Sequence, residues 1–369
     1  MVTRTPGVRL VLIAPAGALL LLGLYAGLLL IGVPLPAFSE RLPQLHAPHL
    51  VFGFVGTLIS LERAVALRTA WGYTAPVLLA VGSLLGLAPA PPTLGATLVV
   101  LGMMLHLAQY LAIWRRQAMT ATAVQALGVV AGLAAALVWA AGVLPSRLVP
   151  LLAVFLVLTI AGERLELARV TAPGLPAERM LFVLATLLAT AALLTLTAPV
   201  VAVPAAGALL LALVAWLLRH DVARTLAGHT GLPRFVAVCL LTGYGWLVVA
   251  GAGWLLGGTR TEGPVYDATT HAIFLGFVIT MIMAHAPLIL PAVLQLGIPY
   301  HPVMYAPVVL LHAGLLLRVV AGDAWGFVPA LQLGGAVSVA AILLFAATAV
   351  TLTVRARRAG RKEASGVAS

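Results

Sequence analysis

Long apolar stretches follow one another along the whole chain, separated by short polar connections. Twelve of these stretches approach or exceed the length that a helix needs to cross a bilayer, which is about 20 residues. They lie near residues 10–32, 46–67, 72–90, 92–114, 119–143, 148–168, 180–198, 200–218, 234–257, 267–291, 302–320 and 327–354. The pattern predicts an all-α, polytopic membrane helix bundle with about 12 transmembrane helices.

Composition supports this class and narrows it. Of 369 residues, 62% are hydrophobic and 8% are charged, and the mean hydropathy is +1.12, unlike soluble proteins. No long linker separates the spans, so we expect a single transmembrane helical domain over residues 1–369, with a short basic tail at 355–369. The lone cysteine, Cys239, excludes a disulfide framework within one chain.

The distribution of arginine predicts the topology. An even number of spans places both termini on one side of the bilayer, and the loops of that side are rich in arginine. The opposite side holds only Arg41, Arg147 and Arg260, with Arg318 near the end of a span. By the positive-inside rule both termini are cytoplasmic, and the net charge of +11 reflects topology and not nucleic-acid binding. The residues on the arginine-rich side are Arg68, Arg115, Arg116, Arg169, Arg179, Arg219, Arg224, Arg234, Arg355, Arg357, Arg358, Arg361 and Lys362.

An internal repeat is suggested by the second and tenth spans, HLVFGFVGTLISLERAVAL and HAIFLGFVITMIMAHAPLIL. An offset of 222 residues aligns His49 with His271 and Phe52 with Phe274. The sixth span ends in TIAGERLELAR, whose Glu-Arg pair repeats that of the second span. Because four helices separate each of these spans, the pattern suggests three four-helix units around a pseudo-threefold axis.

Four histidines fall in the predicted outer half of the bundle or near its middle: His46, His49, His271 and His312. Ionisable side chains within hydrocarbon are costly, which makes each a candidate for function. Two imidazoles from facing helices can hold a haem iron axially, and His49 and His271 come from equivalent helices at matching depth. Arg318, about 9 Å outward from His312, is a candidate partner for the haem propionates. Copper is the alternative metal, with His46, His49 and His271 as ligands.

Other polar residues have simpler interpretations. A single histidine within a membrane is often a hydrogen-bonded packing residue, and we expect this of His106, which lies beside Gln109 and Tyr110. A charged cluster near the cytoplasmic end is expected to form interhelical ion pairs, or alternatively an entrance for protons or substrate. No motif assigns a catalytic residue, and without a CxxCH motif any haem is non-covalent. The cluster consists of Glu62, Arg63, Glu163, Arg164, Glu166 and His285.

These residues resemble two known families. The twelve spans, with histidines on the second and tenth, resemble the architecture of subunit I of haem-copper oxidases. The run PRFVAVCLLTGYGWLVVAGAGWLL followed by DATTHAIFLGFVITMIMAHAP is more similar to the NnrS family of haem- and copper-containing membrane proteins. Those proteins carry a run of LGYxWL type before a helix of the form HAxxxGxxxxMI. The similarity is best over residues 234–291, and only His271 and His49 have matching positions.

The resemblance implies a bacterial inner-membrane protein that binds haem b, with copper as a further cofactor. It also implies a role in nitric oxide metabolism or electron transfer, together with a redox partner or quinol. Spans six and seven contain no histidine, so the copper site of the oxidases has no ligands here. Two other functions stay open: a secondary transporter of a small solute, which the same-direction repeat disfavours, and a non-catalytic membrane assembly subunit.

Overall fold

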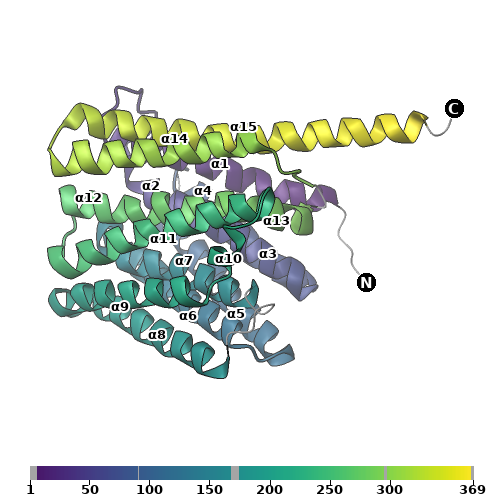
Figure 1. Cartoon of the computed structure of the whole chain (residues 1–369). Helices are drawn as coiled ribbons and strands as arrows, with labels where there is room; N and C mark the ends of the chain where they lie inside the picture. The colour runs from purple at the N-terminus through teal and green to yellow at the C-terminus, as the bar shows by residue number, and fades with distance from the viewer. Residues whose placement is uncertain (1–5, 90, 168–173, 295–296, 367–369) are drawn as a thin grey trace. The chain divides into compact units, whose positions relative to one another are not determined.

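The computed structural model describes residues 6–89, 91–167, 174–294 and 297–366, and every regular element in these ranges is a helix (Figure 1). Within them, eleven helical stretches are long and apolar enough to cross a membrane. A shorter apolar helix, Ala70–Leu85, occupies the position of the third predicted span. The prediction of a multi-pass all-α membrane protein is confirmed, and each of the twelve predicted spans corresponds to a helical stretch.

The chain forms two compact units, Met1–Asp221 with Leu247–Thr270, and Val222–Trp246 with His271–Ser369. One boundary follows Asp221, and the other two fall inside the helices α11 (Leu232–Gly257) and α12 (Pro264–His271). The first unit also contains α1 (Pro6–Leu30), η1 (Pro43–Leu45), α2 (His46–Pro48), η2 (His49–Gly56), α3 (Thr57–Leu67), η3 (Ala70–Tyr73), α4 (Thr74–Leu85), α5 (Pro92–Arg116), α6 (Thr120–Ala140), α7 (Pro145–Leu167), α8 (Leu175–Leu194) and α9 (Pro199–His220).

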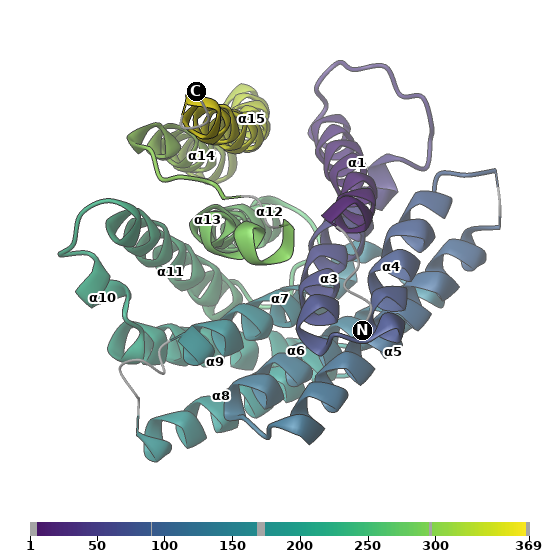
Figure 2. The ribbon, with the colours of Figure 1, turned by 90° about the vertical axis from the view of Figure 1, so that its right-hand side faces the viewer.

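Within the first unit, α4 packs on α5, α5 on α6, and α6 on both α7 and α8 (Figure 2). The most buried of these spans is α7, where 89% of the residues in its apolar window are buried. Apolar side chains surround its whole circumference instead of one face, which is the pattern of a helix enclosed by other helices. Of the three charged residues in its last turns, Arg164 is buried, Glu163 is partly buried and the side chain of Glu166 is 41% exposed.

The second unit contains α10 (Ala223–Leu226), η5 (Ala272–Ile279), α13 (Thr280–Leu294), η6 (Pro302–Met304), α14 (Tyr305–Leu316), η7 (Leu317–Ala324) and α15 (Val328–Gly366). Both views show α14 and α15 side by side as a helical hairpin (Figures 1 and 2). Their backbones approach closely at Gly314 and Gly334, since a Cβ on Gly334 would lie 2.5 Å from the carbonyl oxygen of Gly314. Small residues allow such close approach between membrane helices.

Three segments of the described chain are π-helical, each eight residues long: η2, η5 and η7. The first two end in the related sequences GFVG and GFVI, and an α-helix then begins at a buried threonine, Thr57 or Thr280. This correspondence sets the two helices at an offset of 223 residues. The offset of 222 used to align His49 with His271 is therefore one residue out of register with the backbone.

Close packing in the first unit predicts a strong effect of a small substitution. A Cβ on Gly128 of α6 would lie 2.7 Å from the carbonyl oxygen of Phe155 on α7, and backbone atoms cannot turn aside. We expect Gly128→Ala to lower the free energy of unfolding by about 1–3 kcal/mol. Reversible unfolding in mixed micelles measures the change.

The control is Gly17→Ala in α1, because nothing described lies within 4 Å of the added Cβ. There the better helix propensity of alanine should leave the stability unchanged or raise it by up to about 1 kcal/mol. Equal effects of the two substitutions would contradict the close α6–α7 contact.

Candidate functional site

His49 is the first residue of η2 and is fully buried. Its Nε2 lies 3.1 Å from the carbonyl oxygen of Ser83 on α4. A carbonyl only accepts hydrogen bonds, so Nε2 carries the proton of the neutral ring and Nδ1 keeps its lone pair. Nδ1 has no hydrogen-bond partner among the described residues. The arrangement resembles that of metal-bound histidines, in which one ring nitrogen is tethered to a carbonyl while the other binds the metal.

His46 lies one helical turn before His49 and is tethered to a different helix. Its Nδ1 lies 2.7 Å from the carbonyl oxygen of Gly23 on α1. The ring occupies space that a side chain at Gly27 would fill, since a Cβ there would lie 2.7 Å from Cε1. The glycines of α1 thus make room for His46, and the two histidines connect η2 and α2 with α1 and α4.

His271, the second predicted axial ligand, ends α12 and directly precedes η5. Its side chain is partly buried. His49 belongs to the first compact unit and His271 to the second, and their pairing stays a prediction. The neighbouring sequence packs tightly, because the indole of Trp246 fills the space beside Gly276, where even a Cβ would clash.

His312 on α14 has a different hydrogen-bond pattern. The indole Nε1–H of Trp246 donates to Nδ1 of His312 over 3.0 Å, and the two rings stack at 6.4 Å between centroids. Since an indole only donates, the proton of the neutral imidazole is on Nε2. In this state His312 offers no lone pair to a metal, and a role as ligand requires Trp246 to turn away.

Arg318 lies within η7 and is 5% exposed. Together with His49 and His271, it is one of three predicted site residues that lie in or next to a π-helix. Fewer than one residue in a hundred is π-helical in ordinary proteins, and π-helices often occur at functional sites. The position of all three residues in or next to a π-helix supports them as functional candidates. Hydropathy does not reveal π-helices, so this support is independent of the sequence pattern.

The charged cluster of the first unit contains a buried ion pair. Arg164 of α7 donates through Nε and Nη2 to the two carboxylate oxygens of Asp221, over 2.7 and 2.8 Å. Arg63 of α3 pairs with Glu62 and lies 3.9 Å from Glu166 of α7. Interhelical ion pairs thus occur here as predicted, although Asp221 was not among the residues singled out.

His285, assigned to the same cluster from the sequence, lies in the second unit on α13. It is 5% exposed, and its Nδ1 lies 2.7 Å from the carbonyl oxygen of Met281, one turn earlier in the same helix. Near Arg63 the structure adds one polar residue of α5, Tyr110. The guanidinium of Arg63 lies 5.9 Å from the ring centroid of Tyr110, which is fully buried.

His106 is fully buried on α5 and is tethered by its neighbour Gln109. Nδ1 of His106 lies 2.7 Å from Oε1 of Gln109, whose Nε2 donates to the carbonyl oxygens of Ser60 and Gly72. The expected polar contact is therefore present. It accounts for one ring nitrogen only, because Nε2 of His106 has no partner among the described residues.

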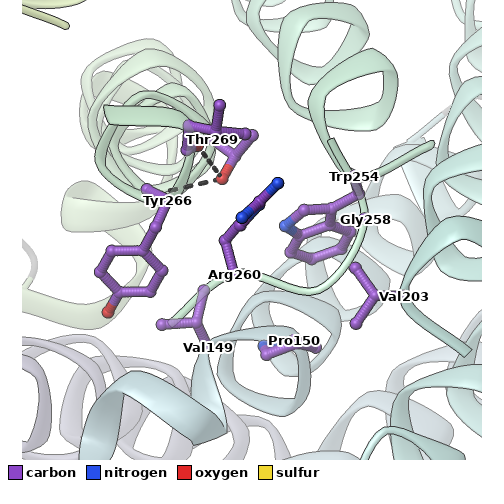
Figure 3. Close-up of a pocket in the computed structure, with 9 residues that line it drawn as sticks. Val149, Pro150, Val203, Trp254, Gly258, Arg260, Tyr266 and Thr269 are labelled. Atoms are coloured by element: carbon purple, nitrogen blue, oxygen red, sulfur yellow. Dashed lines mark hydrogen bonds between the residues drawn. The ribbon is translucent and has the colours of Figure 1, made fainter. Parts of the chain in front are cut away.

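A small cavity of the first unit lies between the starts of α7 and α12 and the end of α11 (Figure 3). The side chain of Arg260 reaches across it between Tyr266 and Trp254. Its volume of about 20 Å³ has room for about one water molecule. The cavity is far too small for a haem or another organic cofactor and does not define a ligand site.

No group of three or more histidine, cysteine, aspartate or glutamate side chains in the described part of the chain could hold a metal ion. A site built on His49 must therefore draw on fewer protein ligands, as a haem does with one or two axial histidines. Among the histidines discussed, His49 and His106 combine complete burial with an unpartnered lone pair.

The helices and their buried polar residues define a multi-pass helical membrane protein. Residues 9–354 match a family described as a domain of unknown function, DUF8744, and the chain belongs to this family. No curated protein and no solved structure matches the chain. The site geometry therefore carries the functional argument.

The Arg164–Asp221 pair predicts a large loss of stability when one partner is neutralised. Asp221→Asn leaves a buried guanidinium without its counter-charge, and we expect the free energy of unfolding to fall by about 3–5 kcal/mol. The control is Glu166→Gln, whose side chain is 41% exposed and 3.9 Å from Arg63; its effect should stay within about 1 kcal/mol. Similar values for the two variants would show that the buried pair is not a principal interhelical contact.

Proposed function

We propose that this protein is an NnrS-like membrane protein that binds haem b, or copper in its place, and acts in electron transfer or in the metabolism of nitrogen oxides. The observation that carries the proposal is the unpartnered Nδ1 of His49, a fully buried nitrogen whose ring is fixed through Ser83. Leaving such an atom without a partner costs about 1–3 kcal/mol, and a metal ion would remove this cost.

Three of the four residues predicted to bind the cofactor suit it, and His312 does not. His49 offers a lone pair on a ring held in one tautomer, which suits both haem iron and copper. His271 follows the same pattern of a histidine directly before or at a π-helix. His312 does not fit as a ligand while it accepts the indole proton of Trp246. The buried guanidinium of Arg318 supplies a positive charge that suits haem propionates.

Bound haem would supply a one-electron couple and an iron on which small gases bind. The protein residues would set the axial nitrogen, the orientation of its ring and the polarity around it. Electron transfer requires a redox partner or quinol. The arginine distribution supports a bacterial inner membrane with both termini in the cytoplasm.

The test is an oxidised-minus-reduced absorption spectrum of the purified full-length protein, with iron and copper analysis of the same sample. Since axial ligation depends on imidazole, we expect His49→Ala and His271→Ala each to reduce the Soret band and the bound iron to about a tenth or less, consistent with a loss of about 1.4 kcal/mol or more in binding. The copper alternative predicts the same loss in the copper content.

The matched control is His229→Ala, an exposed histidine bonded to the carbonyl oxygen of Thr225. It should leave the spectrum and metal content unchanged. A folded His49→Ala protein with an unaltered Soret band and unaltered metal content would contradict the proposal.

A secondary transporter is the second candidate, and one observation favours it. Polar atoms of His106, Tyr110 and Gln125 are buried inside the first unit without described partners, as in a site for a small polar solute. A colourless, metal-free protein that carries a solute into liposomes would support this candidate over the cofactor proposal. A protein that copurifies with a partner complex and does neither would support an assembly subunit.

A further inference from the structure

Four helices of the first unit meet in one buried polar layer. The end of Met103 on α5 reaches Gly132 on α6, where a Cβ would lie 2.7 Å from it. The two helices are antiparallel, so a step of seven residues forward from Met103 and a step of seven residues back from Gly132 cover the same distance, about 10 Å, in the same direction. These steps end at Tyr110 on α5 and Gln125 on α6, which therefore lie at the same level. Gln125 in turn packs directly on Gly162 of α7.

His106 lies one turn deeper than this layer. Its ring centroid is 5.1 Å from that of Tyr110 and 6.3 Å from that of Phe155 on α7. Gln109 accepts the Nδ1 proton, and both amide hydrogens of Gln109 are fixed by backbone carbonyls. The ring therefore has a defined tautomer, and the lone pair of Nε2 is the acceptor at the deep end of the layer.

The layer has unused donors as well as unused acceptors. The hydroxyl of Tyr110, both polar atoms of the Gln125 amide and Nε of Arg63 have no hydrogen-bond partner among the described residues. Buried polar groups are normally paired, and each exception requires an explanation. Several exceptions at one level indicate groups that exchange hydrogen bonds with mobile water or with protons.

Carboxylates predominate in the charged cluster around Arg63, at the solvent-accessible end of the layer. Glu62 and Glu166 are 23% and 41% exposed, whereas Arg63 between them is 10% exposed. Glu163 is partly buried, interacts electrostatically with these groups, and forms no ion pair or hydrogen bond with a described residue. Among the described groups that act on Glu163, Arg164 is neutralised by Asp221, so the three carboxylates of Glu62, Glu163 and Glu166 accompany one further cation, Arg63. The exposed carboxylates of this cluster can therefore take up protons from solvent.

We infer that Glu163, Tyr110 and His106 form a proton path that begins at the carboxylate-rich end of the first unit and ends on Nε2 of His106. Glu163 takes a proton from water at that end. The Tyr110 hydroxyl receives this proton and passes its own to Nε2, directly or through one water. Glu163 returns to the carboxylate and His106 becomes an imidazolium, so that one proton has moved inward with its charge.

Ionisable groups that face His106 come from a small set of elements. Its own helix contributes Tyr110, α3 contributes Glu62 and Arg63, and η3 contributes Tyr73. Neither α4 nor α6 contains an ionisable side chain. From α7 come Glu163, Glu166 and Arg164. The three carboxylates around Arg63 offset the repulsion between its guanidinium and an imidazolium at His106.

This inference does not depend on the proposed cofactor, because His106 is not among its ligands. The experiment uses the full-length protein with ¹⁵N-labelled histidine in lipid nanodiscs, and His106→Gln identifies the resonance by its loss. Protonation of Nε2 by protons from water is then measured by NMR, as exchange between the ¹⁵Nε2 signals of the neutral ring and of the imidazolium. We expect measurable exchange in the unmodified protein, which accelerates as the pH is lowered because protonation of Nε2 is the entry step.

Two nearly isosteric variants test the path. Glu163→Gln and Tyr110→Phe should each slow the exchange by about tenfold or more, which corresponds to a barrier raised by about 1.4 kcal/mol. The ¹⁵N shifts of His106 should stay in place, since the bond to Gln109 is untouched. Glu40→Gln, the same chemical change at an exposed position, should not alter the rate.

The inference is overturned if Nε2 of His106 shows no protonation exchange in the unmodified protein over the pH range studied. It is also overturned if both variants keep the original exchange rate with unchanged His106 shifts. A protein that lacks haem and copper can still pass this test, and a coloured protein can fail it. Failure of this inference and failure of the proposed function are therefore distinguishable.

Discussion

The structure depends on one constraint: a polar group enclosed by apolar helices must find its partner inside the protein. Helices satisfy their own backbones, which leaves the polar side chains to be satisfied by their neighbours. The bidentate pair of Arg164 and Asp221 and the tethering of His49 to Ser83 and of His106 to Gln109 are solutions of this kind. Against this background, the buried nitrogens of His49 and His106 that lack a described partner are informative.

The π-helices belong to the same account. A π-helical turn widens the backbone and is less favourable than an α-helical one, so it persists where the surrounding packing determines it. In η2 the wide turns lie beside α1 and α4, to which His46 and His49 are tethered. In η5 they coincide with the close approach of Trp246 to Gly276. Both helices resume the α form at a buried threonine, which indicates a shared design of the two segments.

Hydropathy alone placed the eleven helical stretches of the described chain that are long and apolar enough to cross a membrane, because an apolar run of this length has few other structures open to it. It could not supply the partners of polar groups, which depend on contacts between distant segments. Arg164 was grouped with Glu163 and Glu62, but its counter-ion is Asp221, 57 residues further on. The one-residue difference in the repeat offset arose similarly, since two matching histidines drew the alignment away from the longer GFVxT match.

The least predictable feature was the state of each histidine, because residue type does not show which ring nitrogen carries the proton. The hydrogen-bond partner of one ring nitrogen determines the state of the other. When the partner is an oxygen that only accepts, the other nitrogen keeps its lone pair, and when the partner is an indole that only donates, the other nitrogen carries the proton. His49 and His106 fall in the first class and His312 in the second. The three rings look alike in the sequence, yet only the first two can act as a base or a ligand without rearrangement. This distinction separates candidate sites from polar packing.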